Sequence, residues 1–261
     1  MITNKRWLSL AIALGLTLSA CQGVPGGAQT SSSAPTSAAA SPPSSDTELS
    51  ADPVAVSYSD RDLSGSYDDT VSTLTLSGQS ASVSGGGAAA ADGAVTITQA
   101  GTYILTGSLT GQVVVRAPED AKVQLVLQGA SIACDWGPAI DIQQADKVFV
   151  TLAEGTANAL SDGANYTLAE GEDEPNACLY AQADLTLNGS GSLAIQALAG
   201  HGVVSKDELT ITGGSYTIDA ASHGLSGKDS VAIADGTFTI TSGKDGIHAE
   251  NSDDLTLGTL Y

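Results

Sequence analysis

The chain of 261 residues is predicted to fold as an all-β parallel β-helix, a solenoid with coils of about 22–25 residues. Three turn motifs near its end begin 22 residues apart: His201-Gly202-Val203, His223-Gly224-Leu225 and Asp245-Gly246-Ile247. Each is followed by a short stretch of alternating apolar and polar residues, the pattern of a strand with one buried face. Between these stretches no run of ten or more residues has a helical period, which disfavours alternating strands and helices.

Residues 1–20 have the pattern of a signal peptide. Lys5 and Arg6 precede an apolar run, 7–18, that is too short to span a membrane. The run ends in Leu18-Ser19-Ala20-Cys21, which resembles the lipobox of bacterial lipoproteins, so Cys21 is expected to carry lipid. A plain secretory signal that happens to contain a cysteine is the alternative. We therefore expect a protein anchored by lipid at the extracellular face of the cell membrane.

Residues 21–51 are rich in Ser, Pro, Gly and Ala and are expected to form a disordered tether, which leaves 52–261 as the folded domain. Without Lys5 and Arg6, seven basic residues face 29 acidic ones, a net charge of about −22. So acidic a chain excludes a nucleic-acid partner, since phosphate binding needs a basic face. Apart from Cys21, the chain has two cysteines, Cys134 and Cys178. Two are too few for a disulfide scaffold, so we expect both to be packed in the protein interior. We expect a monomer.

The predicted elements follow one another with a nearly regular step. A capping segment comes first, with alternating stretches at 58–63, 71–76 and 95–98. Six strands follow, whose equivalent residues are Val123, Val148, Leu185, Leu209, Val231 and Leu255, in steps of 25, 37, 24, 22 and 24. The long step holds an acidic insert between Asn158 and Asn176.

The chain stops soon after the last strand, so we expect C-terminal coils to be missing. A β-sandwich or barrel would explain the alternation but not the near-constant step.

Alignment of these strands puts acidic residues in a column at the strand starts. The column consists of Asp146, Ala183, Asp207, Asp229 and Asp253. Carboxylates on adjacent coils, about 5 Å apart, repel each other by about 3 kcal/mol at a near-surface dielectric. A bound Ca²⁺, which takes several oxygen ligands, would compensate for this repulsion. The alternatives are that Lys206 and Lys228 neutralise the aspartates that follow them, or that the aspartates cap turns.

Other residues are candidates for sugar contacts. His201, His223 and Asp245 form a second column at the turns, where they could bind a cation, contact sugar hydroxyls or simply be polar corner residues. Lys206 and Lys228 are candidate contacts from the neighbouring coils. Trp136, at a turn before Gly137-Pro138, is the candidate for stacking on a sugar ring, with a packed tryptophan as the alternative.

Several motifs in a fixed order extend these observations to a family. After the lipobox and tether come Asp60-Arg61-Asp62-Leu63, Gly137-Pro138-Ala139-Ile140, Ala145-Asp146-Lys147-Val148, Ser205-Lys206-Asp207 and Gly227-Lys228-Asp229. The chain resembles a family of lipoproteins of Gram-positive bacteria described as carbohydrate-binding domain-containing proteins. The resemblance implies a right-handed parallel β-helix similar to pectate lyases, calcium on the coils, and binding of cellulose and polygalacturonate without clear lyase activity. The chain departs from the family pattern at Ala181-Gln182-Ala183-Asp184.

The predicted function is therefore calcium-dependent, non-catalytic binding of a polysaccharide, either polygalacturonate (pectate) or cellulose. An acidic protein repels polygalacturonate unless Ca²⁺ bridges the two, so calcium and pectate binding support each other. Two alternatives stay open. One is a pectate-lyase-like eliminase with Lys206, Lys228 or Lys244 as the base, and the other is a structural or adhesive surface rod.

Overall fold

The computed structural model describes residues 56–67, 71–168, 170 and 174–261, which belong to one compact unit, Pro53–Tyr261. The predicted signal peptide, the lipidated Cys21 and the tether lie outside the described residues, as do Glu172 and Asp173 of the acidic insert. No helix in the described part of the chain is long and apolar enough to cross a membrane.

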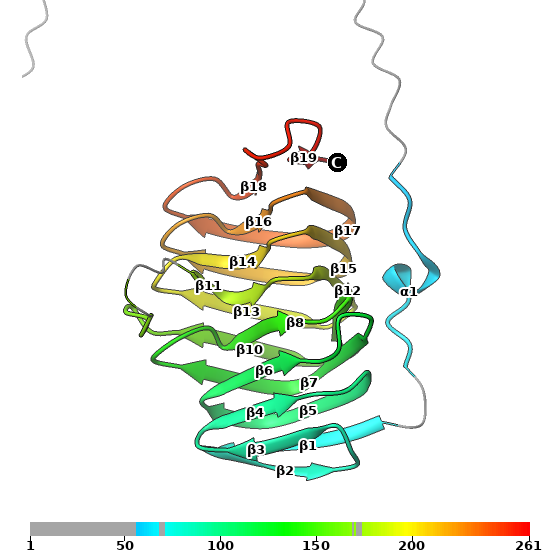
Figure 1. Ribbon diagram of the computed structural model, residues 1–261, viewed down its shortest axis with the longest axis vertical. Coiled ribbons are helices and arrows are strands. Elements are labelled where there is room, and N and C mark those ends of the chain that lie inside the picture. The colour runs from blue at the N-terminus through cyan, green and yellow to red at the C-terminus, as the bar shows by residue number, and fades with distance from the viewer. Residues whose placement is uncertain (1–55, 68–70, 169, 171–173) are drawn as a thin grey trace, which may run out of the picture. The chain divides into compact units, whose positions relative to one another are not determined.

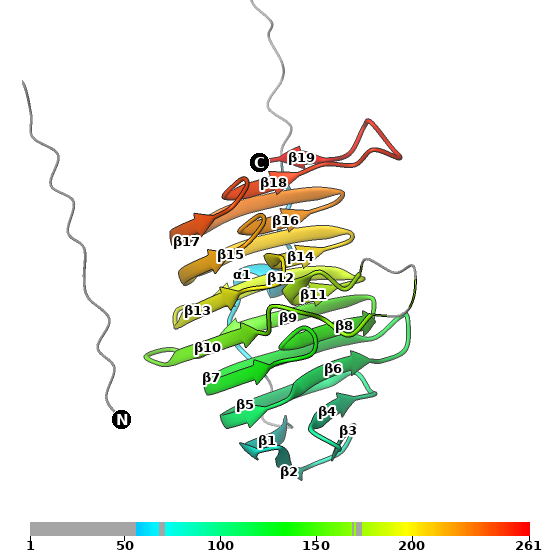
Figure 2. The same cartoon turned by 90° about the vertical axis from the view of Figure 1, so that its left-hand side faces the viewer.

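The described unit is built almost entirely of strands, which are stacked in successive layers (Figures 1 and 2). Its helix is α1 (Asp60–Leu63). The strands are β1 (Val71–Gly78), β2 (Ser80–Ser84), β3 (Ala88–Ala91), β4 (Ala94–Ile97), β5 (Gly101–Thr110), β6 (Gln112–Arg116), β7 (Lys122–Cys134), β8 (Ile140–Gln144), β9 (Lys147–Leu152), β10 (Ala157–Asp162), β11 (Ala177–Ala181), β12 (Asp184–Gly189), β13 (Ser192–Ala197), β14 (His201–Ser205), β15 (Glu208–Ala220), β16 (Leu225–Gly227), β17 (Ser230–Ser242), β18 (Ile247–Ala249) and β19 (Thr259–Leu260).

The strands form two sheets. One has eleven strands in the order β10-β13-β15-β12-β9-β7-β5-β1-β2, with β17 paired to β15 and β19 paired to β17. The other has eight strands in the order β18-β16-β14-β11-β8-β6-β4-β3. Within the described residues, the antiparallel pairs are β1–β2 and β3–β4, and all other pairs are parallel. These two hairpins lie in the segment that the sequence predicts as a cap.

The pairing pattern confirms an all-β fold but corrects the predicted architecture. Strands β7 and β15, of 13 residues each, pair with one neighbour along their first halves and with another along their second halves. As a result, β7, β9, β12, β15, β13 and β10 close into a six-stranded parallel barrel. The predicted right-handed parallel β-helix is therefore wrong. The physical reason is that the chain passes through Gly129 and Gly214, at φ 73° and 99°, without ending the strand as a corner would.

The predicted equivalence of strand residues holds for five of the six positions. Val123 pairs with Val148, Val148 with Leu185, Leu185 with Leu209, and Leu209 with Val231, and all five side chains are fully buried. The sixth position is wrong, because Val231 pairs with Leu260 and Leu255 is 90% exposed. The buried faces of the strands thus form columns of apolar side chains that fill the interior. Cys134 and Cys178 are free and buried, as predicted.

Polar side chains on the outer face of the strands hold α1 against β12. Thr186 donates a hydrogen bond of 2.7 Å to Asp62, and Asn188 donates to the backbone carbonyls of Arg61, Asp62 and Ser64. Lys147 lies 2.9 Å from the same carboxylate. Burial alone would raise the pKa of Asp62, but these hydrogen bonds and those from Ser59 outweigh it and lower the pKa from 3.8 to about 2. Asp62 is therefore the anchor of the helix.

We predict that Asp62→Asn lowers the free energy of unfolding by on the order of 1–2 kcal/mol at neutral pH. Because the pKa of Asp62 is lowered on folding, its stabilisation is present above the unfolded value of 3.8 and is lost as pH falls through about 2. Urea unfolding of both proteins at neutral and at acidic pH measures the difference. Asp60→Asn, which removes an exposed charge from the same helix, is the control. If Asp62→Asn lowered the free energy of unfolding by the same amount at both pH values, the role of the ionised Asp62 as the anchor of the helix would be contradicted.

Candidate functional site

The turn motifs stack closely because glycine allows one backbone to lie against the next. A Cβ atom on Gly202 would lie 2.5 Å from the carbonyl oxygen of Gly224, and one on Gly224 would lie 2.6 Å from that of Gly246. The N–H of Gly202 donates to the carbonyl of His223, and the N–H of Gly224 donates to that of Asp245, each at 3.0 Å. The side chains that precede the glycines therefore lie at the same position in successive layers.

These hydrogen bonds put His201, His223 and Asp245 in one column, as their spacing predicts. The rings of His201 and His223 stack with centroids 5.1 Å apart and an interplanar angle of 17°. His248, from β18, then stacks on His223 at 4.1 Å and 14°. The three histidines of the chain thus form one stack of imidazole rings.

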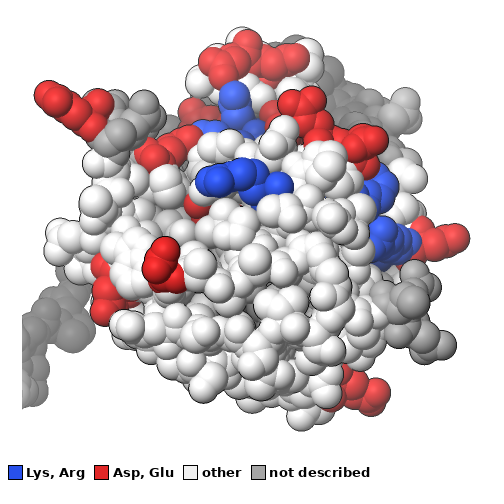
Figure 3. Space-filling model, turned by 60° about the horizontal axis from the view of Figure 1, so that its bottom comes forward, with Lys and Arg blue, Asp and Glu red and all other residues white. Residues whose placement is uncertain are grey.

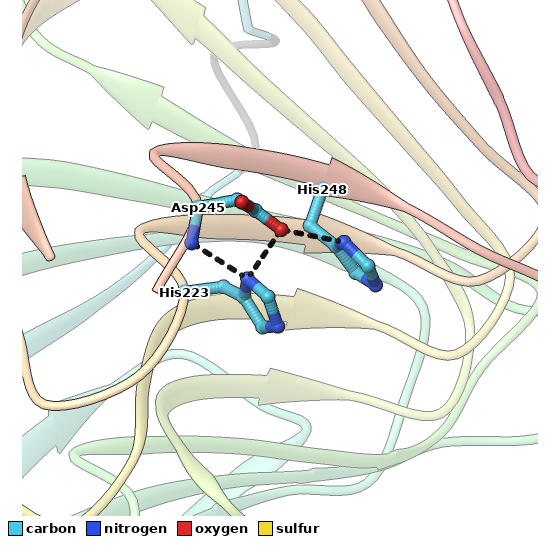
Figure 4. A group of neighbouring side chains, drawn as sticks. All are labelled: His223, Asp245 and His248. Atoms are coloured by element: carbon cyan, nitrogen blue, oxygen red, sulfur yellow. Dashed lines mark hydrogen bonds and ion pairs between the residues drawn. The ribbon is translucent and has the colours of Figure 1, made fainter. Parts of the chain in front are cut away.

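The carboxylate of Asp245 lies beside two of these rings and faces the Nδ1 atom of each (Figure 4). Its Oδ2 is 3.4 Å from Nδ1 of His223 and 3.3 Å from Nδ1 of His248. The backbone N–H of Asp245 also donates to Nδ1 of His223 at 3.2 Å, so that nitrogen acts as an acceptor. On the other side of the stack, Nε2 of His248 is 3.3 Å from a carboxylate oxygen of Glu250. His223 is buried, His248 is half-buried and Asp245 is exposed.

The surroundings keep two of these rings neutral. Burial, followed by the neighbouring His223, lowers the pKa of His201 from 6.5 to about 4. Burial, followed by His248, also lowers the pKa of His223, although Asp245 opposes the shift. Near neutral pH both rings therefore offer a nitrogen lone pair, the form in which imidazole accepts a hydrogen bond or binds a metal.

The histidine stack borders a groove of about 420 Å³, here called the histidine–lysine groove. Its lining includes His201, His223 and His248, the two lysines Lys206 and Lys228, and Glu174, Asn176, Glu250 and Asp253. The groove brings together four of the predicted sugar-contacting residues, which are His201, His223, Lys206 and Lys228. Two buried atoms of groove-lining residues, Oδ1 of Asn176 and Nδ1 of His201, have no hydrogen-bond partner in the described part of the chain.

Both groove lysines are held by carboxylates. Lys206 pairs with Glu174, which also accepts a hydrogen bond of 2.7 Å from the hydroxyl of Tyr180. Lys228 lies 2.7 Å from Asp253, and this hydrogen bond raises the pKa of Lys228. The lysines therefore pair with Glu174 and Asp253, and not with the aspartates that follow them in the sequence.

The predicted aspartate column is only partly formed. Asp146, Ala183, Asp207 and Asp229 each precede the first residue of a paired strand, and the N–H of Asp229 donates to the carbonyl of Asp207. Asp253 does not continue the column, because Gly258 takes that position and donates to the carbonyl of Asp229. Asp146 pairs with Lys122, outside the groove.

Negative charge is concentrated around Asp207. Burial, followed by Asp184 and Asp229, raises the pKa of Asp207, and Lys228 opposes the shift. Burial and then Asp184 likewise raise the pKa of Glu208. Three carboxylates of the column do not converge closely enough to hold one ion by themselves. Among the residues that the structure describes, one group of three possible metal ligands has its ligand atoms close enough together for one ion, and it consists of His223, Asp245 and His248.

The aromatic residues do not form a platform in the groove. Trp136 is 41% exposed but lies outside the groove lining, with its ring near Gly93, where an added Cβ would be 3.5 Å away. Tyr180 is buried and reaches the groove only through Glu174. The face drawn in Figure 3 carries large areas without charge, and its few basic side chains lie among acidic ones.

Sequence reasoning missed His248 and Glu174. His248 pairs in register with Ser226 and so belongs to a different column from His223. The sequence feature that could have indicated His248 is the alternation in β18, where this polar residue separates two apolar ones. Glu174 lies at the end of the acidic insert, which predicts a solvated loop, and nothing in the insert indicates that this residue returns to Lys206.

Comparison with known proteins places the chain in a family. The model of the family described as "Carbohydrate-binding domain-containing protein" matches residues 91–261. The chain therefore belongs to this carbohydrate-binding domain-containing family, which confirms that part of the sequence resemblance.

Two relatives show how far the similarity extends. A "Carbohydrate-binding domain-containing protein" of Acetivibrio thermocellus is 36% identical over 128 residues, which cover 48% of this chain and 45% of the relative. The chain thus matches less than half the length of that relative. A solved structure described as "Structure of the polysaccharide lyase-like protein from C. thermocellum, Gadolinium derivative" is 32% identical, with a TM-score of 0.70. The match covers 72% of this chain and 78% of that one.

The close contact of the turns predicts that two similar substitutions differ in their effect on stability. We expect Gly224→Ala to destabilise the fold by about 1–3 kcal/mol, since its Cβ would meet a backbone oxygen. Gly246→Ala is the matched control, because its Cβ would lie 3.9 Å from the nearest atom, on Ile240. Thermal unfolding of both variants measures the difference. Equal melting temperatures would contradict the packing of the turns.

Proposed function

We propose that the histidine–lysine groove binds an acidic polysaccharide of the polygalacturonate type, with calcium and without catalysis. The observation that carries this proposal is the equivalent position of Lys206 and Lys228 on neighbouring strands. Ser205 pairs with Gly227, so the two lysines follow β14 and β16 at the same level. Neighbouring strands are about 4.8 Å apart, so two ammonium groups can meet successive parts of one linear acidic chain. Membership of the carbohydrate-binding domain-containing family supports a sugar ligand.

The uncharged groups of the groove suit sugar hydroxyls. Oδ1 of Asn176, an acceptor, and Nδ1 of His201, a donor or an acceptor according to its tautomer, are buried without a partner among the described residues, and a buried polar atom left in this state costs about 1–3 kcal/mol. A sugar hydroxyl, which can donate to Asn176 and can donate to or accept from His201, would recover this free energy. Cellulose could make the same contacts, but it has no carboxylates to compete with Glu174 and Asp253 for the lysines. The charges therefore favour polygalacturonate over cellulose.

Calcium is proposed at the acidic cluster around Asp207 and Asp229. Their mutual repulsion, which contributes to the raised pKa of Asp207, would be relieved by a hard cation with oxygen ligands. Backbone carbonyls and the glycan carboxylates would complete its coordination, because the column supplies too few carboxylates by itself. A bridging cation would also overcome the repulsion between the glycan and a chain of net charge −20.

We further propose that the groove is displayed at the extracellular face of the membrane by a lipid on Cys21. The support is the sequence pattern of a positive start, an apolar run and small residues before the cysteine. The tether that follows would allow the folded unit to reach the polysaccharide.

Elimination is the second candidate, because the solved relative is described as polysaccharide lyase-like. A catalytic base has to lose its proton near the working pH. The hydrogen bond with Asp253 raises the pKa of Lys228, which opposes this role, and Lys206 is held in an ion pair with Glu174. Lys244 is exposed and lies outside the groove lining. These contacts support binding over elimination.

Affinity electrophoresis in gels that contain polygalacturonate tests the proposal. We expect the protein to be retarded with Ca²⁺ and released by EDTA, with weaker retardation on cellulose. Lys206→Ala and Lys228→Ala should each weaken pectate binding roughly tenfold, because each removes a charge-assisted contact. Lys122→Ala, which removes a lysine paired with Asp146 outside the groove, is the matched control.

Two results would overturn the proposal. One is the absence of retardation on polygalacturonate both with Ca²⁺ and with EDTA. The other is equal retardation of the lysine variants and the wild type. Ultraviolet-absorbing unsaturated product from pectate would instead support elimination.

A further inference from the structure

The group His223, Asp245 and His248 differs chemically from the acidic cluster that the proposed function assigns to calcium. One ligand atom from each of the three side chains lies within 4.8 Å of the other two. We propose that this group is a binding site for a divalent transition-metal ion of the Zn²⁺ type. The proposal does not rest on the proposed function, since neither a glycan nor calcium takes part in it.

The distances between the ligand atoms suit such an ion. Zinc binds imidazole nitrogen at about 2.0–2.1 Å and carboxylate oxygen at about 2.0–2.2 Å, so tetrahedral ligands lie roughly 3.4 Å apart. Oδ2 of Asp245 is 3.4 Å from Nδ1 of His223 and 3.3 Å from Nδ1 of His248. An ion can therefore fit between these atoms after small movements of the side chains.

The rings have to turn for both nitrogens to coordinate. The planes of His223 and His248 are stacked at 14°, whereas a metal lies in the plane of the ring that binds it. A rotation of each ring about its Cβ–Cγ bond would direct the lone pairs toward the ion. His248 is half-buried and Asp245 is exposed, so both are less enclosed than His223. These two less buried side chains have more room to adjust than the buried His223.

The contacts around the group support metal binding through Nδ1. Nδ1 of His223 accepts a hydrogen bond from the backbone N–H of Asp245 and is therefore unprotonated, so its lone pair becomes available to a metal once that hydrogen bond is released. The Nε2 of His248 is 3.3 Å from Glu250, an acceptor that fixes the orientation of a ligating ring. Two imidazoles and one carboxylate favour zinc and similar metals, whereas calcium prefers an all-oxygen set. Three protein ligands would leave a position for water or an oxyanion.

Metal binding would join two neighbouring turns. His223 precedes β16 and Asp245 precedes β18, while His248 lies within β18. An ion held by all three would therefore cross-link the last layers of the eight-stranded sheet. Since it binds only the folded arrangement, it should also stabilise the protein against unfolding.

Isothermal titration calorimetry of the full chain without an affinity tag, with Zn²⁺ and no glycan, tests the proposal. We expect one Zn²⁺ per chain, an unchanged titration in excess Ca²⁺, and a higher melting temperature with Zn²⁺. His248→Ala and Asp245→Asn should each weaken zinc binding at least tenfold. Asp235→Asn, which removes an exposed carboxylate of β17, is the control and should bind zinc like the wild type.

The outcomes separate this site from the proposed function. An absence of zinc binding, displacement of zinc by Ca²⁺, or unchanged affinity in His248→Ala would overturn the metal site. His248 is half-buried, so its variant is expected to fold even where substitution of the buried His223 does not. Failure of pectate retention would leave the zinc result standing, because the titration contains no polysaccharide.

Discussion

The parallel register of β14, β16 and β18 is the constraint on which the groove depends. Val203 pairs with Leu225, and Leu225 pairs with Ile247, so residues 22 positions apart come to lie at the same level. Glycines at the turns allow this close contact, because a side chain there would meet the next backbone. A shift of register by one residue would exchange the outward and inward faces of each strand. The histidine stack and the pair of lysines would then both be lost.

The same register separates two kinds of charge chemistry. Asp207 and Asp229 gather carboxylates at the strand starts, where an oxygen-preferring cation would relieve repulsion. The neutral imidazoles of His201 and His223 lie at the turns, where nitrogen ligands are available. Lys206 and Lys228 line the same groove as the histidines. Each forms an ion pair with a carboxylate of the protein, which the carboxylate of an acidic glycan could replace. An acidic chain can thus present a local site for an acidic ligand.

The sequence could predict those parts of the molecule that follow the repeat. Spacing predicted the column of His201, His223 and Asp245 and the buried positions from Val123 to Val231, because stacked strands repeat side-chain environments. It could not predict the closed barrel, since a glycine with positive φ permits either a corner or a continuing strand, as at Gly214. His248 was missed because its column holds Ser226 and Val204 at the neighbouring levels and so repeats no histidine. Glu174 was missed because it lies in the acidic insert, which has no counterpart in the other coils.

A crystal structure of the protein with a galacturonate oligosaccharide and Ca²⁺ would test the central claim most directly. The account predicts sugar carboxylates at Lys206 and Lys228, with Glu174 and Asp253 displaced from them, and hydroxyl groups near Asn176. An oligosaccharide bound elsewhere, such as across the exposed ring of Trp136, with both lysine ion pairs intact, would contradict it.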